Sequence, residues 1–372
     1  MKLVVFGLTI TSSWGNGHAT LLRGLFRALH RRGHRAVFFE RDVNYYANHR
    51  DLWTFPEARI ELYSDWSEAT RRAAAALEDA DVGMVTSYCP DGVAATELVL
   101  ESPARLHVFY DLDTPVTLEN LAAGGTPAYI HPGGLGGFDL VLSYTGGAAL
   151  DELRTRLNAR CVAPLYGSVD PEAHQSVQHG SEQRFDLSYL GTYAKDRQDA
   201  LEELFIAPAR QLPERHFVIG GAGYPQAFPW APNIFFMRHL EPAQHSHFYC
   251  SSKLTLNVTR GAMAKMGYCP SGRLFEAAAC GVPIISDQWE GLDQFFSPGS
   301  EILIARNTSD TMAAMNLPEE ELRQIARAAR ERVLDTATAD HRAIDLENVL
   351  ASVSSQSEAT PESMEGMNSL GA

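Results

Sequence analysis

The sequence predicts an α/β protein with two Rossmann-like domains, because short apolar runs alternate with stretches of helical periodicity. Such runs are typical of strands buried in a parallel sheet, and the periodic stretches are typical of the helices that connect them. The pattern stops at a polar stretch near the middle of the chain and then starts again. The chain has 372 residues, of which 45% are hydrophobic, so it can bury two domain cores.

The composition argues against some classes of partner. At a formal net charge of −15, we expect neither nucleic acid nor an anionic membrane as the main partner, although acidic proteins can carry a local basic cleft. The five cysteines have neither metal-ligand nor redox spacing, which predicts reduced thiols. No apolar run approaches the ~18 residues of a membrane span, and the first strand follows Met1 and Lys2 too closely for a signal peptide. We therefore expect a cytoplasmic protein without a membrane span.

The first unit is a strand at residues 3–6, a helix around residues 21–29 and a strand at residues 36–39. The loop after the first strand lacks the G-x-G-x-x-G fingerprint of dinucleotide-binding proteins and carries Gly15-Asn16-Gly17-His18 instead. Ligands of open α/β sheets bind at the carboxyl ends of the strands, which is where this loop is expected.

Six aromatic residues without clear periodicity lie between residues 42 and 66. Sugars and apolar groups stack on such rings, so Tyr45 and Trp53 are candidate ligand contacts. Half-buried core packing is the commoner fate of aromatic residues and stays the alternative.

Another carboxyl-end loop carries Asp111-Leu112-Asp113. Two carboxylates two residues apart can share a divalent cation, but an Asp pair in a loop more often serves a turn. We expect Asp111 or Asp113 to contact a ligand or to act as a reserve base, without a bound metal.

The rest of the first domain continues the alternation up to a glycine-rich connection at residues 124–137, which is either a mobile lid or a plain long loop. The crossing between domains is expected at residues 161–171, followed by the polar segment 172–184. The predicted elements are helices at 69–77, 93–100 and 145–157 and strands at 82–87, 105–110 and 138–143.

The second domain is predicted to repeat the pattern, with a final helix that plausibly crosses back to the first domain. The predicted division is 1–168 for the first domain, 169–340 for the second, 341–353 for the crossing helix and 354–372 for a disordered tail. The predicted strands are at 185–190, 216–219, 233–237, 253–258, 282–285 and 299–305, and the predicted helices are at 200–210, 271–280, 310–315, 319–334 and 341–353.

The stretch at residues 269–287 is the most informative in the chain. Pro270 and Ser271 are favourable helix-start residues, and Gly281 ends the helix before a buried strand. The first-turn N–H groups of such a helix attract a phosphate, and Arg273 adds a positive charge there. Glu276, one turn further, is placed to accept hydrogen bonds from a ribose diol. The alternative is an ordinary βαβ crossover with an Arg and a Glu on its surface.

The run Arg273-Leu274-Phe275-Glu276, followed by Gly281-Val282-Pro283, resembles the donor-binding element of GT-B glycosyltransferases. It is most similar to the bacterial group related to the spore-maturation protein CgeB. The resemblance implies two Rossmann-like domains facing each other across a cleft. It also implies that the helix start, with Ser271 and Gly272, holds the diphosphate of a nucleotide sugar, while Glu276 binds the ribose.

The resemblance also implies further donor contacts. Thr192 and Arg197 follow the first strand of the second domain, and Arg260 could add positive charge against the diphosphate, with a solvated Arg as the equal alternative. Two acidic-Gln pairs, Asp287-Gln288 and Asp293-Gln294, could grip the donor sugar, and the choice between them is open. The candidates for the base site are His239 and Leu240.

Gly15-Asn16-Gly17-His18 is also similar to GT-B enzymes, which makes Asn16 and Gly17 candidate acceptor contacts. The resemblance places the ligand contacts expected of Tyr45, Trp53 and Asp111 or Asp113 on the same acceptor side. In inverting members a His at this place can deprotonate the acceptor hydroxyl, and a neutral imidazole is suited to that task. The alternative is that His18 contacts a ligand without exchanging protons. Retaining members commonly carry a second Glu eight residues before the ribose Glu, where this chain has Tyr268, and this favours inversion.

The predicted function is the transfer of a sugar from a UDP- or TDP-sugar to a small-molecule, glycan or protein acceptor, without a cofactor or metal. Two alternatives stay open at this point. A nucleotide-sugar epimerase shares the architecture, and a non-catalytic spore-coat or surface saccharide-binding protein would tolerate loss of His18 or Glu276.

Overall fold

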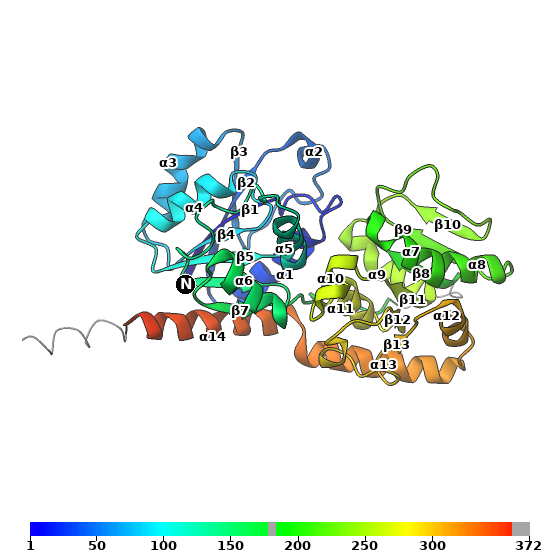
Figure 1. The fold of residues 1–372 in the computed structure, drawn as a ribbon. Coiled ribbons are helices and arrows are strands. Elements are labelled where there is room, and N and C mark those ends of the chain that lie inside the picture. Colours follow the sequence, from blue (N-terminus) through cyan, green and yellow to red (C-terminus); the bar gives the residue numbers. More distant parts are fainter. Residues whose placement is uncertain (178–183, 359–372) are drawn as a thin grey trace, which may run out of the picture.

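The computed structural model describes residues 1–177 and 184–358, and it has two α/β domains side by side (Figure 1). The N-terminal domain is a seven-stranded parallel sheet with the order β3-β2-β1-β4-β5-β6-β7. Its strands are β1 (Lys2–Gly7), β2 (Arg35–Arg41), β3 (Arg59–Tyr63), β4 (Val82–Thr86), β5 (Leu106–Asp111), β6 (Leu140–Ser143) and β7 (Val162–Pro164).

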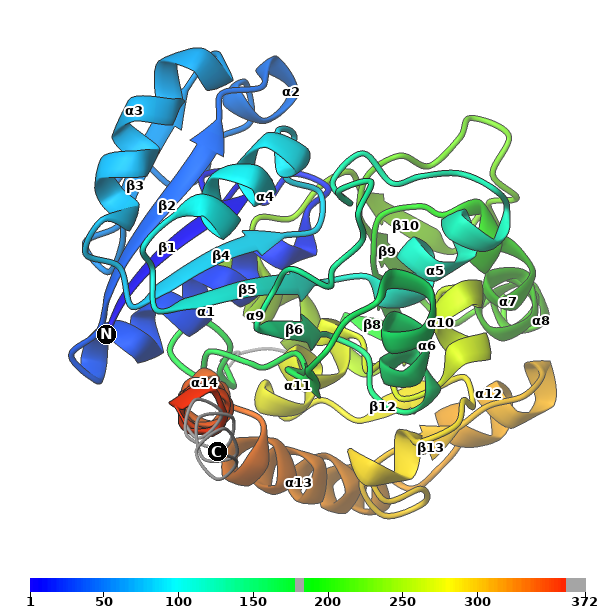
Figure 2. The ribbon, with the colours of Figure 1, turned by 60° about the vertical axis from the view of Figure 1, so that its left-hand side comes forward.

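Helices cover both faces of this sheet, so its strands are buried on both sides (Figure 2). In β1, Val5 belongs to one apolar core and its neighbours Val4 and Phe6 belong to the other, as the alternation of side chains along a strand requires. The helices are α1 (Gly17–Arg31), α2 (Asn44–Ala47), α3 (Trp66–Leu77), α4 (Gly92–Glu101), α5 (Thr114–Ala122) and α6 (Ala148–Leu157).

The C-terminal domain is a six-stranded parallel sheet with the order β10-β9-β8-β11-β12-β13. The last strand has only two residues, where the sequence predicted seven, because Gly299 turns the chain in the left-handed region with a φ of 83°. The strands are β8 (Phe185–Leu190), β9 (Phe217–Gly220), β10 (Ile234–Met237), β11 (Ser252–Asn257), β12 (Ile284–Ser286) and β13 (Leu303–Ile304).

The helix predicted at residues 200–210 is interrupted by a π-helical turn at Glu202–Ile206. Pro208 follows within the same helical stretch and has no N–H to donate to the preceding turn, which explains a local change in the bonding pattern. The helices of this domain are α7 (Gln198–Leu201), α8 (Ala207–Gln211), α9 (Pro242–Cys250), α10 (Gly261–Met266), α11 (Gly272–Ala279), α12 (Thr308–Met315) and α13 (Glu319–Thr336), with short 3₁₀ turns at Lys195–Arg197 and Leu292–Gln294.

The last helix, α14 (Ala339–Glu358), lies against α1 of the N-terminal domain. Its Leu346 and Leu350 are buried in the core of that domain, and Arg32, directly after α1, pairs with Glu347 at 2.6 Å. The helix continues through residues 354–358, which corrects the prediction that the disordered tail begins at residue 354. The helical hydrogen bonding propagates beyond Val353, the last buried residue of the described chain. Residues 359–372 of that predicted tail, and 178–183 of the predicted polar segment, lie outside the described residues.

The two crossings between the domains run side by side. The backbone N–H of Val169 donates to the carbonyl of Ala337 at 3.0 Å, and the N–H of Ala339 donates back to Val169 at 2.8 Å. This short parallel bridge fixes where each crossing leaves its domain. In the described part of the chain, no helix has the length and apolar character needed to span a bilayer.

Candidate active site

A cleft of about 880 Å³ lies between the carboxyl ends of the two sheets. Loops from both domains line it, as expected for ligand sites of open α/β sheets. Contacts across it hold the domains together: α10 packs on α5, and the backbone N–H of Gly146 donates to the carbonyl of Tyr268 at 3.0 Å. The cleft is therefore a shared site rather than a pocket of one domain.

On the C-terminal side, the start of α11 forms part of the cleft wall. Ser271 precedes the helix with an extended backbone, and its side chain makes no capping hydrogen bond to the first turn. Ser271, Gly272, Arg273 and Glu276 all line the cleft, as the sequence predicted for the donor element. The first-turn N–H groups are thus available for an anion.

Three arginines gather around this helix start. Arg273 donates to the carbonyl of Leu190 and, at 2.8 Å, to Oδ1 of Asn257, and its guanidinium lies 4.9 Å from the ring centroid of Tyr189. Among the described residues, Arg197 donates to the carbonyl of Thr192 alone, at 3.3 Å. The acceptors of both arginines are neutral, so these contacts do not place a carboxylate against either guanidinium group.

The third arginine, Arg260, pairs with Asp196 at 3.4 Å. Burial lowers the pKa of Arg197, and the positive charges of Arg273 and Arg260 lower it further. Within residues 1–177 and 184–358, neither Arg197 nor Arg273 forms an ion pair with a carboxylate. Like charges held together at a helix start favour binding of a multiply charged anion.

Glu276 lies one turn along α11 and is surrounded by aromatic and imidazole groups. Tyr249 donates its hydroxyl to Oε2 of Glu276 at 3.3 Å, and Nδ1 of His245 lies 3.3 Å from the same oxygen. Burial acts to raise the pKa of this carboxyl, but His174, His245 and Arg273 outweigh it and lower the pKa to about 2. Glu276 is therefore an anionic acceptor at neutral pH, as ribose hydroxyls require.

The other predicted donor residues divide into two groups. Thr192, His239 and Leu240 line the cleft together with Arg197 and Arg260. Asp287 instead accepts hydrogen bonds from the backbone N–H and the hydroxyl of Thr259, and Gln288 accepts one from Arg306 at 3.1 Å.

The structure does not bring Asp287 or Gln288 to the cleft lining, because the chain turns away from the cleft after β12. Asp293 and Gln294 of the other pair are also absent from the lining, and the carbonyl of Gln294 accepts a hydrogen bond from Arg332. Neither acidic-Gln pair is thus positioned to hold the donor sugar in this arrangement.

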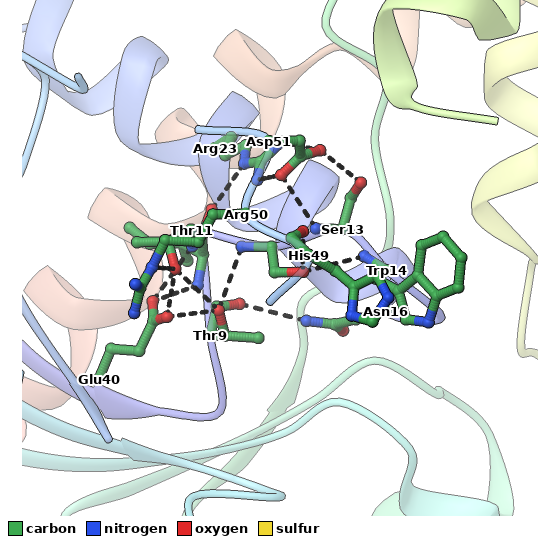
Figure 3. Close-up of polar contacts among 12 residues, drawn as sticks. Thr9, Thr11, Ser13, Trp14, Asn16, Arg23, Glu40, His49, Arg50 and Asp51 are labelled. Atoms are coloured by element: carbon green, nitrogen blue, oxygen red, sulfur yellow. Dashed lines mark hydrogen bonds and ion pairs between the residues drawn. The ribbon is translucent and has the colours of Figure 1, made fainter. Parts of the chain in front are cut away.

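On the N-terminal side, a buried polar network fixes the loop between β1 and α1 (Figure 3). Glu40, at the end of β2, accepts hydrogen bonds from the backbone N–H groups of Ile10 and Thr11 at 2.9 and 3.1 Å and from the hydroxyl of Thr9 at 2.6 Å. Asp51 pairs with Arg23 at 2.6 Å. Two buried carboxylates therefore tie this loop to its neighbours.

The fixed loop positions the start of α1. Asn16 caps the helix by accepting a hydrogen bond from the N–H of His18 at 3.2 Å, and it donates to the carbonyl of Thr9 at 3.2 Å. Asn16, Gly17 and His18 all line the cleft. The sequence predicted these three positions without the network that holds them.

His18 faces Asp113 of the β5–α5 loop. Nε2 of His18 lies 3.7 Å from Oδ1 of Asp113, and the hydroxyl of Tyr88 donates to Oδ2 of Asp113 at 2.8 Å. Burial acts to raise the pKa of the Asp113 carboxyl, but His18, Tyr88 and Arg260 outweigh it and lower the pKa. Asp113 is thus a fixed anion that can orient His18 and stabilise its protonated form.

Asp111, the other aspartate of that loop, has a different environment. It is fully buried and does not line the cleft. Its Oδ1 accepts hydrogen bonds from Thr117 and the N–H of Asp113, and burial raises its pKa to about 6. Asp111 therefore shapes the loop, and the structure does not bring it within reach of an acceptor.

The predicted aromatic contacts also differ from the structure. Tyr45 and Trp53 are exposed and do not line the cleft, whereas Tyr46 does. Trp14 lies between His49, with ring centroids 4.1 Å apart, and His239 of the other domain, at 4.2 Å. Tyr45 lies on α2 and Trp53 on the segment that follows it, and both side chains are exposed to solvent.

Sequence reasoning missed several residues of the site. Tyr88, His245 and Tyr249 line the cleft, and His174 approaches Glu276 from behind the lining. The signal that pointed to Asp113 and Glu276 was their place at helix starts or strand ends. Tyr88 carries the same signal, because it follows β4, whereas His174, His245 and Tyr249 have no such local mark.

Comparisons with known proteins identify the fold. Residues 197–348 match the family model described as "Glycosyl transferase-like", and no curated protein matches the chain. Sucrose-phosphate synthase from Thermosynechococcus elongatus is 13% identical with a TM-score of 0.67, over 96% of this chain and 100% of that one. HepE from Anabaena, in complex with UDP and glucose, is 12% identical with a TM-score of 0.63, over 94% of this chain and 99% of that one.

An α-glucosyltransferase in complex with UDP and DNA is 11% identical with a TM-score of 0.69, over 94% of this chain and 99% of that one. These likenesses confirm the predicted GT-B fold. The family match over residues 197–348 agrees with the prediction of a glycosyltransferase. The resemblance to the CgeB-related group stays a prediction.

Proposed function

We propose that this protein is a GT-B glycosyltransferase that moves a sugar from a nucleotide diphosphate sugar, with UDP or TDP as the leaving nucleotide, to an acceptor hydroxyl. The observation that carries the proposal is the group of three arginines at the open start of α11, with anionic Glu276 one turn away. A nucleotide diphosphate matches this arrangement, because its diphosphate would face the arginines and its ribose hydroxyls would donate to Glu276. Two of the similar structures are complexes with UDP, which supports the same donor class.

In the proposed complex, the diphosphate lies on the N–H groups at the start of α11 and contacts Arg273, Arg197 and Arg260. Its ribose hydroxyls donate to Glu276, and the base lies toward His239 and Leu240. As the bond to the sugar breaks, negative charge grows on the diphosphate. The fixed guanidinium groups then stabilise the transition state more than the ground state.

The acceptor hydroxyl is proposed to enter from the N-terminal side, beside Asn16 and Gly17. With Nε2–H of His18 directed to Asp113, Nδ1 is the basic nitrogen that takes the hydroxyl proton. The acceptor oxygen forms a bond to the anomeric carbon while the carbon–oxygen bond to the diphosphate breaks. The electron pair leaves with the nucleotide diphosphate, and the proton stays on His18.

One base and one displacement give inversion at the anomeric carbon, which remains part of the proposal. Tyr268, at the place where retaining members carry a second Glu, is packed between Gly147 and Gly291 and does not line the cleft. This arrangement supports inversion because it offers no carboxylate there. Nuclear magnetic resonance of the product anomer, compared with the donor, tests the stereochemistry.

We propose that the transfer step uses no cofactor or metal, since the arginines supply the positive charge on the leaving group. The acceptor class is a small molecule, glycan or protein rather than nucleic acid, given the net charge of −15. A cytoplasmic location, proposed from the isolated cysteines, fits access to nucleotide sugars.

The test is incubation of the purified protein with a panel of UDP- and TDP-sugars, with and without candidate acceptors. We expect thermal stabilisation by UDP or TDP and release of nucleotide that depends on an acceptor. Donor isomerisation without acceptor would instead identify an epimerase. Saccharide binding that survives His18→Ala and Glu276→Ala, with no turnover of any donor, would identify a binding protein.

A further inference from the structure

His174, His245 and Glu276 form a buried cluster at the back of the proposed ribose site. The three come from separate parts of the chain: the segment after β7, helix α9 and helix α11. Their candidate ligand atoms all lie within 4.8 Å of one another. Nε2 of His174 is 3.9 Å from Oε1 of Glu276, and Nδ1 of His245 is 3.3 Å from Oε2.

His174 is the unusual member, because its side chain is 99% buried, with 1% exposed, and aimed into the cluster. Within the described ranges, neither of its ring nitrogens has a hydrogen-bond partner, and Nδ1 of His245 also has none. Buried polar atoms of this kind are usually satisfied in folded proteins. These ring nitrogens could therefore coordinate an ion without losing a hydrogen bond to the described protein.

The backbone around His174 is held in place. Its N–H donates to the carbonyl of Asp170 at 2.9 Å, and Ser246 of α9 donates to the carbonyl of Ala173 at 3.1 Å. Asp170 in turn accepts a hydrogen bond from Arg27 at 2.9 Å. The segment that carries His174 is therefore tied to the helix that carries His245.

Two imidazoles and one carboxylate are a ligand set suited to Zn²⁺ and similar divalent transition metals. Ligand atoms about 2.1 Å from a tetrahedral ion lie roughly 3.4 Å apart. Side-chain movements of about 1 Å would therefore bring the three ligand atoms of the cluster to the separation that an ion requires. Hard cations such as Mg²⁺ prefer oxygen ligands and fit this set less well.

We propose that His174, His245 and Glu276 bind a divalent transition metal ion of the Zn²⁺ class, and that this ion competes with the nucleotide ribose for Glu276. The first half of the proposal rests on the cluster alone. The second half rests on the proposed function, because it takes Glu276 as the ribose ligand. Occupancy by metal would make the donor site sensitive to the availability of such ions.

The test uses the full chain and Zn²⁺ or Co²⁺ as the probe, with isothermal titration for affinity and visible absorption of Co²⁺ for coordination by nitrogen ligands. We expect one ion per chain in the wild type, and binding weaker by at least about tenfold in His174→Ala. His247→Ala is the matched control, since it removes an exposed histidine of the same helix α9 and should leave binding unchanged.

His245→Asn serves as a second variant if His174→Ala does not fold, as judged by circular dichroism. Equal Zn²⁺ affinity in the wild type and in a folded His174 or His245 variant would overturn the metal site. Absence of Co²⁺ absorption in the wild type would do the same.

The second readout is UDP affinity with and without Zn²⁺. Because UDP itself chelates Zn²⁺, the comparison is between the wild type and His174→Ala, in which chelation is the same. We expect Zn²⁺ to weaken UDP binding only in the wild type, and equal weakening in both proteins would overturn the competition. If neither protein binds UDP, the proposed function fails while the metal measurement still stands.

Discussion

Replacing Arg273 by Met should weaken binding of nucleotide diphosphates while leaving nucleoside binding nearly unchanged. A unit charge about 4 Å from a phosphate oxygen contributes roughly 4 kcal/mol at an effective dielectric constant of about 20. Arg197 and Arg260 remain in the variant, and salt screens part of the effect, so we expect a net loss of about 2 kcal/mol. This corresponds to UDP binding that is ~30-fold weaker.

Isothermal titration with UDP and with uridine, at two salt concentrations, measures the effect. The wild type should prefer UDP strongly and lose part of that preference at high salt, whereas Arg273→Met should show a smaller preference and a smaller salt effect. Arg306→Met is the control, because Arg306 is exposed and bonds Gln288 outside the cleft lining. Unchanged UDP affinity in a folded Arg273→Met protein would refute the proposed diphosphate site.

Three further predictions concern single carboxylate or imidazole groups. His18→Ala should lower kcat by about 10²- to 10⁴-fold with little change in UDP affinity. Steady-state kinetics with an identified acceptor measures this effect, and an unchanged kcat would exclude His18 as the base. Glu276→Gln should weaken UDP binding by about 1–2 kcal/mol, because the anionic acceptor of the ribose hydrogen bonds becomes a neutral one. Isothermal titration with UDP measures this, and an unchanged UDP affinity would contradict the prediction. Asp111→Asn should stabilise the protein at pH 7, because burial raises the folded pKa of Asp111 to about 6, above its unfolded value near 3.8. The folded state then binds the extra proton between these pH values, so the wild type loses stability as the pH rises from 4 to 6. The gain, of order 1–3 kcal/mol in urea unfolding at pH 7, should vanish near pH 4, and a gain that is independent of pH would contradict this cause.

Much of the donor half was predictable from local sequence. The helix start at Ser271 and the glycine after it are signals within a few residues, and Arg273 and Glu276 follow at fixed helical distances. The strands of both sheets were found because a buried parallel strand is a continuous apolar run. The predicted boundaries were wrong where a turn ends an element inside an apolar run. The strand predicted at 299–305, for example, is reduced to Leu303–Ile304 in β13.

Other parts of the site depend on residues far apart in the chain. Asp287 and Gln288 fit a sequence pattern, but the hydrogen bonds of Asp287 to Thr259 keep it out of the cleft. Asp111 and Asp113 are equivalent by sequence, yet one is sealed in the core and the other faces His18.

The sequence by itself determined the two α/β domains and the anion-binding helix start, because both follow from the chemistry of neighbouring residues along one element. Only the tertiary structure decided which groups meet across the cleft. His174 and His245 approach Glu276 from 102 and 31 residues away in the chain, and no periodicity carries that information. Such contacts are set by how α9, α11 and the segment after β7 pack together, which is a property of the whole fold.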